Sequence, residues 1–149
     1  MPRFKFKLQT VMDVKEKRVE KWQLELARRQ LILAGIEQEK NSIICRIGQL
    51  QENWRAAMLN KPEVNDLMFF HRHRLYLHKL LEQKEMERWQ ALCEVNNARE
   101  KLIAAKKEHE ILKKLREKSY KTYLACEAKN EQKFLDELGN NAFARKMGR

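Results

Sequence analysis

Three histidines lie close enough together in this chain to suggest a metal site or a proton-transfer group. His71 and His73 are two residues apart and point to different sides of a helix, and His78 follows one and a half turns later. Basic side chains lie beside them and would repel a cation: Arg72, Arg74 and Lys79. We therefore interpret the histidines as solvated or partner-facing, with a pH-sensitive role as the alternative.

The cysteines and carboxylates carry no chemical motif either. Cys45, Cys93 and Cys126 lie 48 and 33 residues apart, which fits neither a disulfide framework nor a zinc site. The 21 acidic residues are scattered among basic ones, as on a solvated helical surface, and no glycine-rich phosphate loop is present. The sequence therefore predicts no catalytic residue, no metal, no cofactor and no small-molecule substrate.

The elements that position these side chains follow a heptad pattern. Apolar residues recur at alternating steps of three and four, filling 12 of 16 such positions from Lys5 to Ala57 and 12 of 18 from Leu67 to Cys126. We call these positions the seam. A spacing of about 3.5 residues keeps one stripe facing a partner only if two helices wind around each other. The predicted fold is all-α, an elongated antiparallel two-helix coiled coil that forms a helical hairpin.

Helix boundaries follow from turn and capping residues. We expect a first helix over about 5–59, a hairpin loop over 60–65, a second helix over about 66–139 and a flexible tail over 140–149, all in one domain. Asn60 can adopt the left-handed conformation that ends a helix, and Pro62 cannot continue one. Asn65 or Asp66 can cap the second helix.

Composition limits the class of protein. Charged residues make up 36% of the chain, which has only four Gly and two Pro. A helix pair buries one stripe per helix and builds no enclosed pocket, which argues against an enzyme. The net charge of +11 is spread thinly rather than gathered into a nucleic-acid arm. No signal peptide or membrane span is recognisable, so we expect a cytoplasmic protein.

Polar residues interrupt the seam of both helices. They are Lys15, Arg29 and Lys40 in the first helix, and Arg74, Lys84, Arg88, His109 and Arg116 in the second. Such residues weaken a coiled coil but fix its register, and their aliphatic stems can remain packed. The alternative is that they make the helix pair flexible, so that it can twist or bend.

Two groups of apolar residues exceed what the seam can cover. One is near the loop: Trp54, Met58, Met68, Phe69, Phe70 and Tyr76. The other is near the C-terminus: Tyr120, Tyr123, Leu124, Phe134, Leu135, Leu138 and Phe143. Unpaired apolar surface usually marks an intermolecular contact, so both groups are candidate partner sites. The segment Arg3–Leu8 alternates basic and apolar residues and could be a short strand or a membrane-surface anchor. We prefer an aromatic start to the first helix that packs on the C-terminal residues or on a partner.

Three segments resemble the bacterial flagellar FliJ family. The opening MPRFKFKLQTVMDVKE is similar to the family pattern F-x-F-x-L-Q-x-V-L-x-x-K-E, with Met12 replacing the usual Leu, a volume-conserving change. The resemblance continues in Tyr76–Leu80, after the predicted loop, and in Tyr120–Leu138, where EQKFLDE (131–137) looks like the family's C-terminal segment.

The resemblance implies a non-enzymatic stalk of the flagellar type III export apparatus, similar in fold to a rotary-ATPase stalk. Its terminal end would insert in the hexameric export ATPase, through Phe4, Phe6, Leu8, Phe134, Leu135, Leu138 and Phe143. Its hairpin tip would contact the cytoplasmic domain of the export gate, through Ile47, Leu50, Trp54, Tyr76 and Leu80. Export chaperones are further implied partners, and the protein would associate peripherally with the cytoplasmic face of the membrane at the flagellar base, supporting flagellum assembly, motility and chemotaxis.

Two other functions remain open from the residues. An adaptor of a virulence-type type III secretion system would have the same architecture. A basic helical hairpin could also bind nucleic acid or the ribosome, although we expect no nucleic acid because the charge is dispersed; such binding would weaken steeply with salt.

Overall fold

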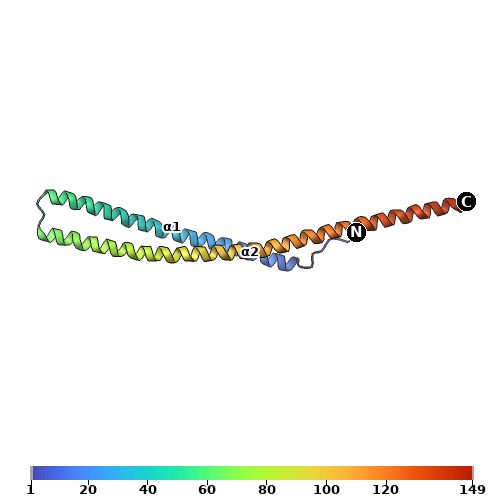
Figure 1. The fold of residues 1–149 in the computed structure, drawn as a ribbon, viewed down its shortest axis with the longest axis horizontal. Helices are drawn as coiled ribbons and strands as arrows, with labels where there is room; N and C mark the ends of the chain where they lie inside the picture. Colours follow the sequence, from blue (N-terminus) through green and yellow to red (C-terminus); the bar gives the residue numbers. More distant parts are fainter. Residues whose placement is uncertain (1, 149) are drawn as a thin grey trace. The chain divides into compact units, whose positions relative to one another are not determined.

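Two long helices pack antiparallel to form a helical hairpin. The computed structural model describes residues 2–148, and within that range α1 spans Gln9–Leu59 and α2 spans Val64–Met147, with no strand (Figure 1). The predicted all-α hairpin is confirmed.

The seam is the buried stripe, as predicted. In α1, the positions from Met12 to Ala57 that are not fully exposed follow the seam, with Glu25 as the one addition. The most buried side chains of the described residues also lie on it: Ile43, Leu77, Ala91, Val95, Ala98, Leu102 and Ala105. Burial follows the 3.5-residue period because each helix has only one neighbour to pack against.

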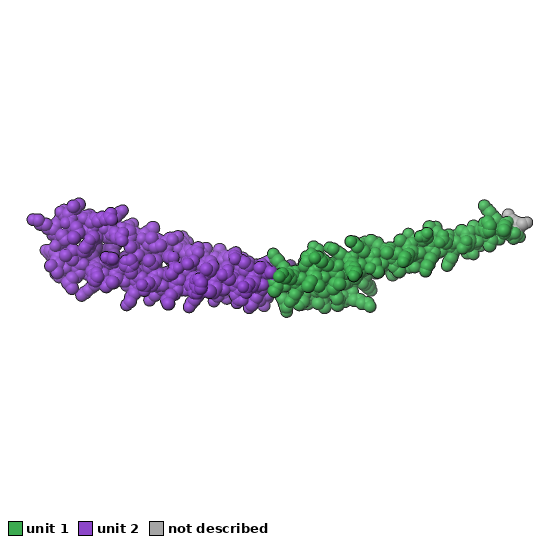
Figure 2. Space-filling view, viewed as in Figure 1, with its two compact units in different colours: residues 1–19, 104–149 green, residues 20–103 purple. Residues whose placement is uncertain are grey.

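The described residues divide into two compact units, coloured separately in Figure 2. Unit 2 comprises residues 20–103 and contains the loop and both helix segments that adjoin it. Unit 1 comprises residues 2–19 and 104–148, where the first turns of α1 pack on the C-terminal half of α2.

The first helix begins later than expected. Residues 2–6 are not helical, and the turn that leads into α1 is closed by the Gln9 N–H, which donates to the Phe6 carbonyl at 3.1 Å. The predicted start at about residue 5 is therefore wrong by about one turn. The aromatic side chain of Phe4 packs on α2, and that contact is made by extended rather than helical backbone.

The loop is shorter than predicted and uses a different residue for its turn. It occupies residues 60–63, and the left-handed position is Lys61, with φ of 49°, rather than Asn60. The Glu63 carbonyl accepts from the Leu67 N–H at 3.2 Å, so α2 begins before Asn65 and Asp66, the predicted caps. Asp66 instead lies in the first turn, where a negative charge favours the helix N-terminus.

The second helix ends later than expected. α2 continues through Gly139 to Met147, so residues 140–147 are helical rather than a tail, and Arg149 lies outside the described residues. A single glycine costs a helix only about 1 kcal/mol, and no proline follows it. Arg145 and Lys146 in the last turn complement the negative end of the helix dipole.

Candidate functional site

Cations on the seam of unit 2 reach carboxylates on the facing helix. Lys84 Nζ lies 2.5 Å from Glu39, and Arg29 pairs with Glu94. Between these two pairs the α1 residue advances by ten while the α2 residue falls back by ten, as one antiparallel register requires. Lys40 and Glu85, the chain neighbours of Glu39 and Lys84, also pair across the two helices. Arg29, Lys40 and Lys84 thus pair across the two helices, and their role in fixing the register stays a prediction.

Glu85 is the most strongly perturbed acid of this network. Hydrogen bonds from Arg88, at 2.8 Å, and then from Lys40 lower the pKa of the Glu85 carboxyl to about 2. In unit 1, the hydrogen bond from Lys15, at 2.7 Å, likewise lowers the pKa of Glu108. Both carboxylates are therefore ionised near neutral pH, and their ion pairs with Lys40 and Lys15 join the two helices.

An aromatic cluster extends from the seam to the outer surface next to the loop. Trp54 of α1 meets Phe70 of α2 edge-on, with ring centroids 5.4 Å apart. Phe69 lies 6.3 Å from Phe70 and stacks on His73 at 6.1 Å, and His73 lies 6.4 Å from Tyr76. Phe69 and Tyr76 are 67% and 60% exposed, so the outer part of this cluster is open to a partner.

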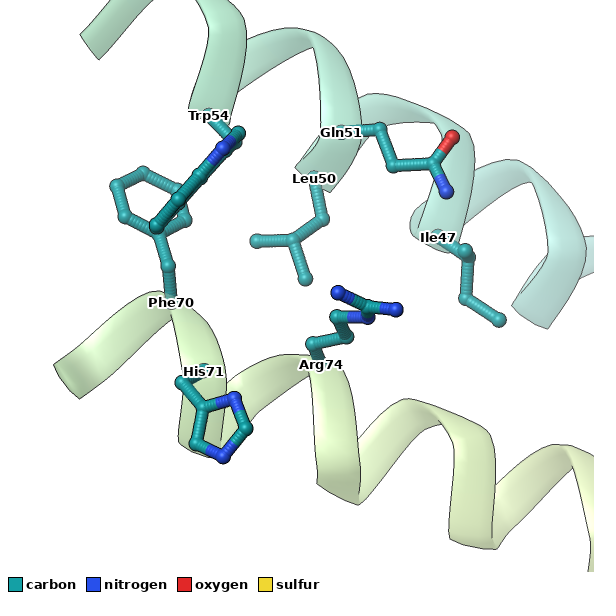
Figure 3. Close-up of a pocket in the computed structure, with 7 residues that line it drawn as sticks. All are labelled: Ile47, Leu50, Gln51, Trp54, Phe70, His71 and Arg74. Atoms are coloured by element: carbon teal, nitrogen blue, oxygen red, sulfur yellow. The ribbon is translucent and has the colours of Figure 1, made fainter. Parts of the chain in front are cut away.

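A cleft of about 300 Å³ opens between the helices beside this cluster (Figure 3). Its lining residues are Ile47, Leu50, Gln51, Trp54, Phe70, His71 and Arg74. Of the five residues predicted for the hairpin tip, Ile47, Leu50 and Trp54 line this cleft together. Tyr76 instead lies in the exposed part of the aromatic cluster, and Leu80 is half-buried on α2.

The residues predicted for the terminal end fall into two separate groups within unit 1. Phe4 packs on α2, with its ring 5.2 Å from Tyr120 and 5.4 Å from Tyr123. Tyr123 also donates its hydroxyl hydrogen to the Pro2 carbonyl. Phe6 is half-buried and Leu8 is 41% exposed. The N-terminal segment thus packs on α2 as expected, but as non-helical backbone rather than as the start of a helix.

The other group lies on the last part of α2, where every residue from 128 to 147 is exposed. Phe134 and Leu138 are four residues apart and share a face with Leu135. Phe143 is five residues beyond Leu138, about 140° around the helix, and lies on another face. The structure therefore brings three of the four C-terminal residues together and separates the fourth.

Sequence reasoning missed the polar lining of the cleft. Arg74 resembles the other seam cations in the sequence, and Gln51 and His71 lie off the seam. The available signal was the lack of any acidic residue from Leu67 to Leu81, which leaves Arg74 without a carboxylate in the neighbouring turns of its own helix.

Neither helix within residues 2–148 contains a segment long and apolar enough to span a membrane. The three cysteines are free and exposed, and no group of three or more potential metal ligands occurs in the described part of the chain.

Comparison with known proteins identifies one family. No curated protein and no solved structure is similar enough to this chain to count as a match. The family model described as "Flagellar FliJ protein" matches residues 4–148, which includes both helices, the loop and all of the candidate partner residues. The chain therefore belongs to the FliJ family of flagellar proteins, which are components of the flagellar export apparatus.

Proposed function

We propose that this chain is a non-enzymatic stalk that couples the hexameric export ATPase to the membrane export gate. The observation that carries the proposal is the exposed C-terminal part of α2, residues 128–147, whose apolar face has no partner among the described residues. The cleft and the aromatic cluster of unit 2 supply a second, chemically distinct surface. A coupling protein requires two such surfaces, one for each partner.

The first surface suits a helix-binding groove in the ATPase ring. Phe134, Leu135 and Leu138 are 62%, 65% and 50% exposed. Residues spaced by three and four on one face are the anchors by which an amphipathic helix enters an apolar groove. Burying these three side chains in a partner would contribute several kcal/mol at about 25 cal/mol per Å² of apolar surface. The packed N-terminal segment, with Phe4, Phe6 and Leu8, would brace the helix beside this surface.

The second surface suits the cytoplasmic domain of the gate. It combines exposed aromatic rings at Phe69 and Tyr76 with the cleft that Trp54 lines. Tyrosine and tryptophan at the centre of an interface supply large buried area and a hydrogen-bonding group in one side chain. Export chaperones could use the same exposed rings, and binding to the gate would hold the protein peripherally at the membrane.

Coupling between the surfaces would be mechanical. Two helices in a register fixed by ion pairs transmit a displacement along their common seam without any chemical step. A small change in the ATPase at one surface would thus alter the position of the other relative to the gate.

The decisive experiment measures ATP hydrolysis by the purified export ATPase with added wild-type or variant protein. We expect wild type to stimulate hydrolysis and the double variant Phe134→Asp, Leu138→Asp to lose most of that stimulation. Leu24→Asp is the matched control, because Leu24 is 74% exposed but lies in unit 2. Full stimulation by the double variant, with unchanged helicity by circular dichroism, would refute the ring-binding surface.

A further inference from the structure

Arg74 differs from the other seam cations of unit 2. Arg29, Lys40, Lys84 and Arg88 each have a carboxylate within ion-pair distance. Arg74 forms no ion pair and no side-chain hydrogen bond with any residue in the described range 2–148, and it is exposed although it occupies a seam position. Arg74 is therefore the one seam cation of unit 2 without a carboxylate partner among the described residues.

The chain cannot readily supply that carboxylate from α2. Between Asp66 and Glu82 this helix has no acidic residue, although it carries three basic ones. In unit 2 the other seam cations draw their carboxylates from positions beyond this stretch, among them Glu39, Glu85 and Glu94. The segment around Arg74 is thus positively charged and has no internal counter-charge on its own helix.

Around Arg74 the two helices leave an open cleft that could bind an anion, instead of packing tightly along the seam. The side chain reaches from α2 into the cleft, towards Leu50 and Ile47 of α1 (Figure 3). Trp54 and Phe70 close one side of the cleft with their edge-to-face pair. A guanidinium beside aromatic and aliphatic walls can bind a carboxylate with two parallel hydrogen bonds, and the low-dielectric walls strengthen them.

We propose that the cleft binds an acidic segment of the partner protein, with one carboxylate on the Arg74 guanidinium and a neighbouring apolar side chain against Leu50 and Trp54. The occupant follows from charge complementarity and from the apolar walls. The inference rests on the proposed function, because the partner is taken to be the cytoplasmic domain of the export gate. Arg74 is then a specificity determinant of that docking.

The test compares binding with stability in the same variants. Arg74→Leu places an apolar side chain on the seam, so it should raise the thermal midpoint while it removes the carboxylate receptor. We expect Arg74→Leu to bind the purified gate domain about ten- to a hundredfold more weakly than wild type, the loss of one charge-assisted hydrogen-bonded pair. Arg74→Lys should lose less than Arg74→Leu, since it keeps the charge but not the planar donor pair. Lys79→Leu, which removes an equal charge from the same stretch of helix, is the control and should bind within about twofold.

A second measurement locates the contact. In a chain with Trp22→Phe and Trp89→Phe, Trp54 is the only tryptophan. Its emission should shift on addition of the gate domain, and the shift should be lost in Arg74→Leu.

The outcomes separate the two proposals. If the wild-type chain does not bind the gate domain, both proposals are overturned. Equal binding by wild type and Arg74→Leu overturns only the acidic-segment inference. The inference is also overturned if vesicles of anionic phospholipid, and not the gate domain, distinguish wild type from Arg74→Leu, because the anion would then be a lipid headgroup.

Discussion

Arg29 of α1 joins two carboxylates at once: its Nε donates to Glu25 in the same helix at 3.0 Å, and its Nη1 pairs with Glu94 of α2. The side chains of Arg29 and Glu94 are 32% and 54% exposed, so solvent screens the pair. An ion pair of this kind contributes little stability, about 0.2–1 kcal/mol. It also disfavours the register displaced by one heptad in which Lys101 would take the place of Glu94 opposite Arg29.

Removing the pair should therefore change specificity more than stability. We expect a double-mutant cycle of Arg29→Ala and Glu94→Ala to give a coupling energy below about 1 kcal/mol. Arg29→Leu should raise the urea midpoint, because it extends the apolar seam. Disulfide trapping between cysteines introduced at facing seam positions would report the register. A coupling energy above about 3 kcal/mol would contradict the screened geometry.

Acid should destabilise the folded chain through Glu85, which pairs with Arg88 on its own helix and with Lys40 on α1. The pKa of this carboxyl is about 2 in the folded chain, below its ordinary value of 4.5, so the folded state binds the proton less readily than the unfolded state does. The stabilisation is complete above about pH 4.5 and is lost as the pH falls towards 2. Thermal midpoints measured from pH 7 to pH 2 should fall in this window, and the fall should be smaller in Glu85→Gln. Identical profiles for the two proteins would rule out a contribution from Glu85.

Two glycines inside α1 are sites where alanine should stabilise. Neither Gly35 nor Gly48 has any atom within 4 Å of the position a Cβ would occupy, and neither has a positive φ. Gly35→Ala and Gly48→Ala should each raise the free energy of unfolding by about 0.5–1 kcal/mol, since alanine loses less backbone entropy in a helix. Urea denaturation would show a higher midpoint with an unchanged slope. A lower urea midpoint in either variant would contradict the prediction that alanine stabilises the helix at that position.

The exposed rings of the aromatic cluster should be needed for function but not for folding. Phe69→Ala with Tyr76→Ala should leave the helical circular dichroism within about 10% of wild type, because both side chains are mostly exposed. The same double variant should abolish swimming of a strain that carries it, if these rings dock on the gate. Leu24→Ala with Leu31→Ala, at 74% and 75% exposure, is the matched control. Normal swimming of the Phe69 and Tyr76 variant would exclude these rings as a docking surface.

The seam could be predicted because burial in a helix pair depends only on periodicity. Leu77, Val95 and Ala98 are buried where the heptad frame places them. The partners of the seam cations could not be predicted, because Glu85 and Glu94 lie off the seam and become partners only once the register is known. The heptad pattern also does not determine the backbone conformation of the loop. Lys61 takes the left-handed conformation, although the neighbouring Asn60 adopts it more readily by residue type.

The candidate sites were predictable in composition but not in geometry. An excess of aromatic residues near the loop indicated a surface, but not that Trp54 and Phe70 would flank a cleft with Arg74 inside it. At the other group, the sequence placed Phe143 with Phe134, whereas a helix that continues to Met147 turns the two side chains to different faces.

The two helices differ in how easily they bend. α1 contains glycine at 35 and 48, whereas α2 contains neither glycine nor proline before Gly139. Because glycine makes a helix easier to bend, an applied force should bend α1 before it bends α2. In the proposed coupling role, α2 would therefore keep its direction while α1 accommodates repeated bending.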